Sequence, residues 1–291
     1  MVIIVVMYGW GSLTTLPELT SFPRVTPYDY REQNLMEAKQ LPSFSHPFGT
    51  DRLGRDILTR IVYGLRTTVI ITVITLVTGS LSIGVTLGLF AGYFGRIIDT
   101  LIKRVGEVTS AFPEIFLVLI FIATFKPPLT EWVRENLGSS VIRLGVADYL
   151  ILSLALAIFS WFGMARLVRG QVLQAREIQY VEAARSIGVS SPGVLFRHVL
   201  PNIMGPIIVL VSAGLAGVAG SEVFLSFLGI GVQPPTPSLG LMIFENASIS
   251  VLRTNPHLLL FPVGTLTVLL FTFICWETPS TTPLIHELVD H

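Results

Sequence analysis

The sequence predicts an all-α, polytopic membrane protein, and two observations carry that prediction. The chain of 291 residues is 51% hydrophobic and only 13% charged, with a mean hydropathy of +0.70, whereas about a quarter of the residues of a soluble domain are charged. Several apolar stretches also approach the ~20 residues that a helix needs to cross a bilayer. Helices are expected because a helix satisfies its own backbone hydrogen bonds in hydrocarbon.

Five apolar stretches meet or approach the length of a membrane span. The second and third are short cores that need flanking residues to reach it. In chain order the stretches are Thr68–Phe94, Phe112–Phe125, Tyr149–Met164, Ile203–Ile230 and Leu258–Ile274.

A sixth candidate opens the chain at residues 1–12, where Met1–Tyr8 is apolar before a Gly-Trp-Gly-Ser sequence interrupts it. It is a poor signal peptide, because no Lys or Arg precedes the apolar run. We interpret residues 1–12 as the remnant of a truncated first transmembrane helix.

The polar segments between the stretches set the domain plan and the orientation. Residues 13–66 are predicted to form an extracytoplasmic loop with helical turns, and residues 67–274 a transmembrane domain with a cytoplasmic insert at about 170–202. The short loops at 95–111 and 165–202 carry more Lys and Arg than those at 126–148 and 231–257, which favours a cytoplasmic location for the first two. Counting the long first loop reverses the tally, but long loops carry little weight in this rule.

Several function classes find no support in the residues. Cys275 is the only cysteine, and the five histidines lie in different segments, so no disulfide framework, zinc motif or other metal site is predicted. The net charge is +0 and the basic residues do not alternate with aromatic residues, which argues against nucleic acid as a partner. With no P-loop and no nucleophile elbow, we expect neither an enzyme nor a chain that binds a cofactor or ATP itself.

The insert contains two predicted helical pieces. Residues 177–187 can form a short helix that Gly188 ends. A second piece is predicted to begin at Ser191-Pro192, because serine caps helices and proline suits the first helical turn.

Glu182, Ala183 and Ala184 form the part of the insert that favours a docking surface. The two alanines let another backbone approach closely, and the glutamate adds polarity and register to such a contact. Composition alone would favour a generic amphipathic cytoplasmic loop over a docking element.

Two further segments flank the membrane region. Gly49 and Gly54 alternate with Asp51, Arg55 and Asp56, which predicts a capped turn that runs into a helix and carries a surface salt-bridge cluster. Just after the Ile203–Ile230 stretch, a proline-rich segment is predicted to end the span and stiffen the loop that follows. Its prolines are Pro234, Pro235 and Pro237.

Glu222 is the polar residue of the spans that most needs an explanation, because burying a charge in hydrocarbon is costly. Two interpretations stay open: the side chain lines a water-filled passage or faces a partner, or it lies hydrated near the outer interface. Gly79, Gly84 and Gly88 predict close helix packing rather than a cargo site.

Three segments resemble, in the same order, motifs of one transporter family. The insert is similar to the EAA motif of ABC importer permeases, residues 46–56 resemble HPxGTDxxGRD, and residues 225–238 resemble LSFLGLGVQPPTPSWG. The chain is thereby identified as a member of the C-type permease subunits of dipeptide, oligopeptide and nickel uptake systems. The resemblance covers roughly Pro27–Phe271 and implies the type I ABC importer permease fold on a six-helix plan.

The resemblance also implies roles for particular residues. In the EAA loop, the positions expected to contact the ATPase subunit are Tyr180, Glu182, Ala183, Ala184, Gly188, His198, Leu200 and Pro201. His198 departs from the aliphatic residue that many members have there. The other family-motif positions are Gly49, Thr50, Asp51, Gly54, Arg55, Asp56, Gly229, Gln233, Pro234, Pro235 and Pro237.

The function implied is that of one membrane subunit of an ATP-driven importer, most simply for di- or oligopeptides. The expected partners are a B-type permease, two ABC ATPase subunits that bind the ATP, an extracellular substrate-binding protein and membrane lipid. A nickel or chelated-metal importer of the same family is the first alternative. An ion-coupled secondary transporter is the alternative from another class, but no internal repeat supports it. An intramembrane protease would need a catalytic set that the spans lack.

The tail, residues 275–291, does not match the family's ending. Members end in a pattern like LGDxLxDxLDPR, and the codons from Cys275 onward, read one frame over, permit LGDALDDALDPR. Our hypothesis is a frameshift near Ile274, with a divergent tail as the alternative.

Overall fold

A computed structural model of the chain describes residues 26–138, 142, 145–176, 178–179, 181 and 188–289. Across these residues the regular elements are helices, and one isolated β-bridge joins Thr50 to Asp56. The all-α prediction is confirmed. The chain divides into two compact units, each assembled from separate parts of the sequence. Unit 1 is Met1–Val73, Phe121–Ser153 and Ala216–Cys275, and unit 2 is Ile74–Ile120, Leu154–Leu215 and Trp276–His291.

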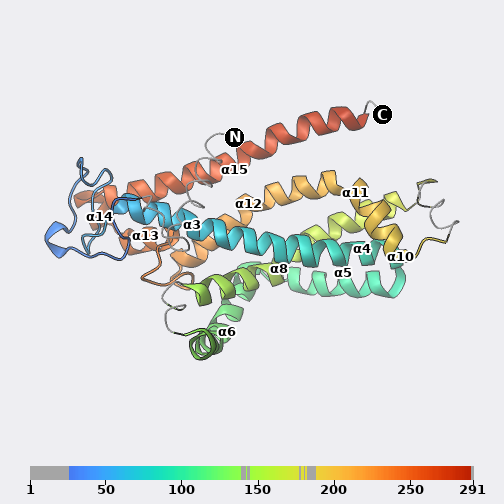
Figure 1. Cartoon of the computed structure of the whole chain (residues 1–291), viewed down its shortest axis with the longest axis horizontal. Helices are drawn as coiled ribbons and strands as arrows, with labels where there is room; N and C mark the ends of the chain where they lie inside the picture. Colours follow the sequence, from blue (N-terminus) through green and yellow to red (C-terminus); the bar gives the residue numbers. More distant parts are fainter. Residues whose placement is uncertain are drawn as a thin grey trace. The chain divides into compact units, whose positions relative to one another are not determined.

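Within the described residues, four helical stretches are long and apolar enough to cross a membrane (Figure 1). The first, Ile57–Phe94, runs through α3 (Ile57–Thr75), η2 (Leu76–Gly84) and α4 (Val85–Phe94). The others are α6 (Glu114–Leu137), α8 (Val146–Ala175) and α12 (Met204–Phe227). A shorter apolar helix, His257–Phe273, opens α15 (His257–Val289).

Each of the five apolar stretches of the sequence thus corresponds to a helix. The fifth helix differs at its end, because α15 continues beyond the expected Ile274 to Val289. The candidate at residues 1–12 lies outside the described residues.

The segment after Phe94 was predicted to be a loop in the cytoplasm, and the loop part of that prediction was wrong, while its cytoplasmic location stays a prediction. Gly95, with φ +58°, ends α4, and the chain continues as α5 (Arg96–Ser110). The Asp99 carboxylate receives two hydrogen bonds from the Arg169 guanidinium of α8, one of them from Nη2 at 2.7 Å. Gly106 packs against the Phe162 ring so closely that an added Cβ would overlap it. These contacts hold α5 against α8.

Close helix packing at the glycines of the Ile57–Phe94 stretch is confirmed within unit 2. A Cβ added at Gly79 would lie 2.7 Å from Ala157 Cα, and one added at Gly88 would lie 2.7 Å from Val168 Cβ. Gly84 lies between them, five residues after Gly79, and in an ordinary α-helix two residues five apart lie on different faces. The wider π-helical turn of η2 compensates, because it accommodates an extra residue per turn.

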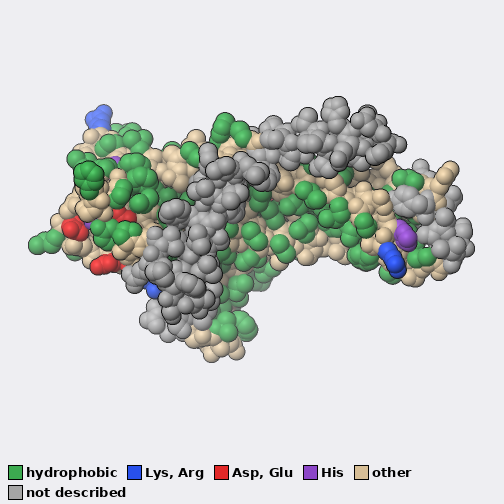
Figure 2. Space-filling view, turned by 45° about the horizontal axis from the view of Figure 1, so that its top comes forward, with side chains coloured by type: hydrophobic (Ala, Val, Ile, Leu, Met, Phe, Trp, Pro, Cys, Tyr) green, Lys and Arg blue, Asp and Glu red, His purple; other side chains and the backbone are tan. Residues whose placement is uncertain are grey.

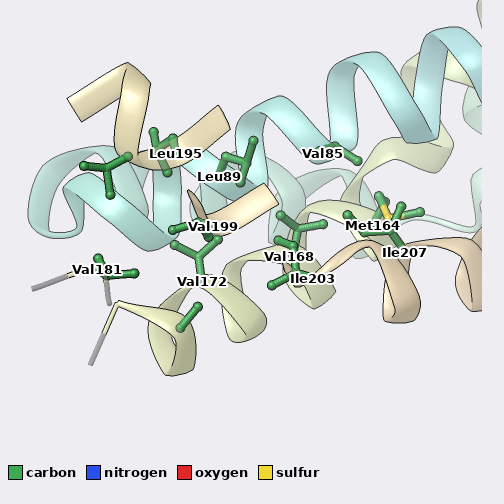
Figure 3. Close-up of a cluster of buried hydrophobic side chains, with 12 residues drawn as sticks. Val85, Leu89, Met164, Val168, Val172, Val181, Leu195, Val199, Ile203 and Ile207 are labelled. Atoms are coloured by element: carbon green, nitrogen blue, oxygen red, sulfur yellow. The ribbon is translucent and has the colours of Figure 1, made fainter. Parts of the chain in front are cut away.

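The core of unit 2 lies where α4 packs against α8 (Figure 3). Val85 and Leu89 of α4 pack with Met164, Val168 and Val172 of α8. The same cluster contains the short elements that follow the insert: α10 (Ser191–Gly193), η3 (Val194–Val199) and α11 (Leu200–Asn202) contribute Val194, Leu195 and Val199.

Unit 1 contains the remaining short elements. They are η1 (Leu35–Glu37), α13 (Leu239–Asn246) and α14 (Ile249–Thr254). Hydrophobic side chains are exposed over much of the described surface (Figure 2), among them Ile97 and Leu101 of α5 and Phe116 and Ile120 of α6. Exposed apolar area of this extent is typical of a protein surrounded by acyl chains or by partner subunits.

Candidate functional sites

The insert at 170–202 contains the predicted ATPase contact, and its described parts lie in unit 2. Tyr180, Glu182, Ala183 and Ala184 lie outside the described residues. The predicted second piece is confirmed, since α10 begins at Ser191 after Ser190, with a proline in its first turn.

Gly188 has φ +84°, and a Cβ added there would have no heavy atom within 4 Å. This position therefore needs glycine for its backbone conformation and not for space. The three remaining predicted positions lie on the helical turns after it: His198 and Leu200 are half-buried and Pro201 is exposed.

The described part of the insert has one face anchored and one face open. Val181, Leu195 and Val199 are buried in the unit 2 cluster, while Ile178 and Phe196 are about half exposed. Sequence reasoning missed these two exposed apolar side chains. The sequence carried no clear signal for them, because single hydrophobic residues are common on protein surfaces and do not by themselves mark a contact.

The Gly49–Asp56 segment forms a buried network of hydrogen bonds and ion pairs in unit 1. Asp51 Oδ1 accepts the backbone N–H groups of Leu53 and Arg55, and its Oδ2 accepts Arg55 Nε at 2.7 Å and Arg60 Nη1 at 2.6 Å. Arg60 Nη2 then donates to Glu245 Oε2 of α13 at 3.1 Å. We call Asp51, Arg55, Arg60 and Glu245 the Asp51 cluster.

The expectation of a surface salt-bridge cluster was wrong, because Asp51, Arg55 and Arg60 are all buried. Burial is tolerated because every charge has a partner of opposite sign and hydrogen bonds that replace water. The capped turn itself is confirmed: Asp56 Oδ2 accepts the Thr59 N–H of α3 at 2.7 Å, and Gly49 and Gly54 have φ of +78° and +71°.

Thr50 and His46 also belong to this buried polar network. Thr50 Oγ1 accepts the Gln40 N–H at 2.9 Å and donates to the Glu37 carbonyl. His46 Nδ1 lies 3.0 Å from Asp56 Oδ1, with its ring stacked on Tyr28. The motif therefore fixes the loop before α3 to the start of that helix.

The second motif forms a loop at residues 228–238, also in unit 1. The prolines were expected to end the span, but α12 ends earlier, at Phe227, where Gly229 adopts φ +76° and its N–H bonds to the Ser226 carbonyl. Pro234 and Pro235 are exposed and Pro237 is buried. Thr67 of α3 donates to the Pro237 carbonyl at 2.9 Å.

An ion pair that sequence reasoning missed holds the middle of this loop. Lys126 Nζ of α6 lies 2.8 Å from Asp148 Oδ1 of α8 and donates to the Gly231 carbonyl. Asp148 Oδ2 in turn accepts the Gln233 N–H at 2.9 Å. A lysine just before two prolines in an apolar helix was the available signal, since a charge there needs a partner.

Glu222 lies in the interior of unit 1 and is 0% exposed. Its carboxylate accepts hydrogen bonds from Thr68 of α3 at 2.7 Å and from Ser226 and Ser238 at 3.0 and 3.1 Å. These hydroxyls of its own chain satisfy the carboxylate in place of the water expected near the outer interface. Whether it lines a passage stays a prediction.

A pocket of about 310 Å³ opens beside the Asp51 cluster. It is lined by Asp51, Arg52, Leu53, Arg55, Glu245 and Asn246, all of unit 1. Among the described residues, no group of three or more His, Cys, Asp or Glu side chains could hold a metal ion.

The apolar spanning helices define a polytopic membrane protein. Residues 84–275 match the family described as "Binding-protein-dependent transport system inner membrane component". The chain belongs to this family, whose members are transporter components of the inner membrane rather than enzymes.

Curated relatives agree with this assignment. The chain is 37% identical to the dipeptide transport system permease protein DppC of Alkalihalophilus pseudofirmus over 240 residues, 82% of this chain and 71% of the relative. It is 34% identical to the oligopeptide permease protein OppC of Bacillus subtilis, over 86% of this chain and 75% of the relative. The glutathione permease protein GsiD of Pectobacterium atrosepticum is 37% identical, with coverages of 85% and 76%.

The fold is that of an ABC importer permease. A chain from an inward-facing structure of the MetNI methionine ABC transporter superposes with a TM-score of 0.51, covering 75% of this chain and 91% of that chain. At 18% identity, this likeness concerns the fold alone. The predictions of family, fold and multi-pass membrane location are confirmed.

Proposed function

We propose that this chain is the transmembrane subunit of an ATP-driven importer of di- or oligopeptides. The observation that carries the proposal is the similarity, over most of the chain, to permeases named for dipeptide, oligopeptide and glutathione transport. The exposed apolar helices and the paired interior charges suit a membrane subunit that shares its surfaces with other chains.

The same proposal includes the partners. A B-type permease completes the passage, two ABC ATPase subunits bind and hydrolyse ATP, and an extracellular substrate-binding protein delivers the cargo. The family's own description, "binding-protein-dependent", supports the last of these. The ATPase contact is assigned to the insert, whose described part presents Ile178 and Phe196 on an open face.

The mechanism is alternating access. Closure of the ATPase pair changes its contact with the insert, and the anchored face of the insert carries that change to α4 and α8 through Leu195, Val199 and Val172. Such coupling requires that the ATP state binds the inward- and outward-facing forms with different free energies.

The test is cargo uptake in a strain that lacks its own peptide permease genes. Cells that express this chain with its partners should accumulate a labelled dipeptide, and an excess of unlabelled tripeptide should compete. Uptake of radioactive nickel without peptide uptake would instead support the nickel alternative. Uptake that persists when the ATPase subunits are omitted would contradict an ATP-driven importer and support an ion-coupled transporter.

A further inference from the structure

The helix α5 of unit 2 has three faces, and only one of them packs on α8, through Asp99 and Gly106. Side chains three or four residues apart share a face of a helix, so two further sets form the other faces. The apolar set is Ile97, Leu101, Val105 and Val108, and the polar set is Thr100, Lys103, Arg104 and Glu107. We call the first set the apolar stripe of α5. It lies beside the polar face along the whole helix.

The apolar stripe is exposed over three helical turns. Ile97 is 83% exposed, Leu101 63% and Val108 62%. Leaving large apolar side chains in water forgoes roughly 1.5–3 kcal/mol for each of them, so a face of this kind indicates a surrounding of acyl chains or another apolar surface. From its first to its last residue the stripe spans about 17 Å, close to the ~15 Å depth of one leaflet of the hydrocarbon core.

The polar face contains a pocket of about 250 Å³, lined by Thr100, Lys103, Arg104 and Glu107. Lys103 Nζ lies 3.2 Å from Asp99 Oδ2, but the same carboxylate already accepts two hydrogen bonds from Arg169. Arg104 Nη1 lies 3.9 Å from Glu107 Oε2, which is too far for a hydrogen bond. Lys103 can therefore turn to another anion without leaving Asp99 unbalanced, and the Arg104 guanidinium is free to donate.

Positive charge is in excess around this pocket. Between Arg96 and Ser110 of α5 and along the facing turns Phe162–Arg169 of α8, five cations accompany two carboxylates. The cations are Arg96, Lys103, Arg104, Arg166 and Arg169, and the carboxylates are Asp99 and Glu107. Arg166 lies over the Phe162 ring, which itself contacts Gly106 of α5. An anionic ligand complements this excess, and basic pockets beside spanning helices are typical sites for lipid headgroups on the cytoplasmic side.

We propose that α5 binds one anionic phospholipid. The lipid phosphate accepts hydrogen bonds from Lys103 and Arg104, and an acyl chain lies along the apolar stripe. A phospholipid joins a charged headgroup to an acyl chain, and α5 places a cationic pocket directly beside an apolar stripe, as helices at the membrane interface do. The predicted cytoplasmic location of residues 95–111 agrees with this, because anionic lipid is concentrated in that leaflet. The inference goes beyond the proposed function and requires only that the chain is in a membrane.

The experiment counts the lipids bound to the full-length chain by native mass spectrometry while phosphatidylglycerol is titrated into the detergent solution. Phosphatidylcholine with the same acyl chains measures binding without net charge. The headgroup variant is Lys103→Gln/Arg104→Gln, and its control is Arg134→Gln, which changes an exposed arginine of α6 outside the pocket. The stripe variant is Leu101→Gln, and its control is Leu252→Gln, at an exposed leucine of α14.

We expect the wild-type chain to bind phosphatidylglycerol at least tenfold more tightly than phosphatidylcholine. In the headgroup variant, Kd for phosphatidylglycerol should rise roughly fivefold for each cation removed, with Kd for phosphatidylcholine unchanged. Leu101→Gln should raise Kd for both lipids severalfold, because it removes acyl contact. Both controls should match the wild type. Added phosphatidylglycerol should raise the melting temperature of the wild type and not that of the headgroup variant.

A merely structural role for the two cations predicts a lower melting temperature without lipid and an unchanged Kd in the headgroup variant, and that result would overturn the proposal. Glycerophosphoglycerol, the headgroup without acyl chains, tests for a plain phosphate site: full competition at the lipid's own concentration would also overturn it. Weaker binding of the ATPase subunits to the headgroup variant, with lipid binding unchanged, would assign this face to a protein contact instead. Each of these outcomes leaves peptide uptake, and with it the proposed function, intact.

Discussion

Asp51 is the residue on which the Asp51 cluster depends. Both of its carboxylate oxygens accept hydrogen bonds, two from backbone N–H groups and two from the Arg55 and Arg60 side chains. Removing it would leave two guanidiniums buried with only Glu245 to balance them. A buried charge without its partner is far more destabilising than a lost surface pair.

We therefore expect Asp51→Ala to lower the free energy of unfolding by about 3–5 kcal/mol. The control is Glu131→Ala, which breaks an exposed pair with Arg134 and should cost about 0–1 kcal/mol. Thermal unfolding of the detergent-solubilised protein, followed by size-exclusion fluorescence, gives both values. Equal melting temperatures for the two variants would contradict the claim that the buried ion pairs of Asp51 stabilise the fold.

Gly188 and Glu182 belong to the proposed ATPase contact. Aspartate tolerates positive φ better than most residues, so Gly188→Asp tests the added charge more than the backbone. We expect Gly188→Asp and Glu182→Lys to reduce peptide uptake roughly tenfold or more, while ATP hydrolysis and membrane insertion persist. Gly205→Asp, at a glycine outside the insert that also has no close neighbours, is the control. Normal uptake in both test variants would refute the coupling role.

At the scale of single residues, the sequence predicted which glycines form turns better than it predicted which charged side chains are buried. The glycines at 49, 54, 188 and 229 were all singled out, and all have positive φ. Burial of Asp51 could not be foreseen, because Arg60 reaches Glu245 across 185 residues of sequence. Local spacing shows that acidic and basic residues alternate, but not that a distant helix covers them.

At the scale of elements, the contact that η2 and α4 make with α8 depends on small residues. Gly88 lies against Val168, whereas Gly163, on α8 itself, has no heavy atom within 4 Å of an added Cβ. The glycines of η2 and α4 let the two backbones approach closely, and this close packing stabilises helix pairs where lipid replaces water.

We expect Gly88→Leu to destabilise the protein by about 1–3 kcal/mol or more, because the side chain cannot fit without moving α8. Gly163→Leu should change the melting temperature little. Thermal unfolding curves of both variants test this. Similar decreases in melting temperature would contradict the close packing of Gly88 against α8.

The attachment of α5 predicts a pH dependence. The Arg169 hydrogen bonds, helped by Lys103, lower the pKa of the Asp99 carboxyl below its ordinary value of 3.8, although its partial burial opposes this. A lowered folded-state pKa means that the pair stabilises the protein above the ordinary carboxyl pKa, and that this stability is lost as the pH falls through the folded-state value.

Arg169→Met should therefore be less stable than wild type at neutral pH, and the difference should shrink once the pH falls below 3.8. Melting temperatures of both proteins along a pH series give the comparison. A difference that stays constant across the series would mean that charge on Asp99 does not hold α5.

Apolar length was sufficient to predict the five apolar helices, because hydrocarbon leaves a spanning chain few choices. It was insufficient for α5, whose Arg, Lys, Asp and Glu residues alternate with apolar ones. Such an amphipathic helix looks like a loop when only long apolar runs are counted. The end of α12 was misplaced for a related reason: Gly229 ends the helix before the prolines can.

For the whole molecule, the sequence motifs identified the family that the comparisons show. They could not supply the partners' identities or the geometry of the insert around Glu182, which lies outside the described residues. The family match ends at residue 275, where the tail departs from the expected pattern. The frameshift hypothesis stays a prediction, and a nucleotide read across the Cys275 codon tests it.

The most direct measurement of the proposed function is made in proteoliposomes that contain this chain, a B-type permease and the ATPase subunits. ATP hydrolysis and the accumulation of a labelled peptide are recorded together, with and without the substrate-binding protein. We predict that accumulation requires both ATP and the binding protein, and that it ceases when this chain is omitted. Peptide accumulation without this chain, or with it but without ATP, would contradict its role as an importer subunit.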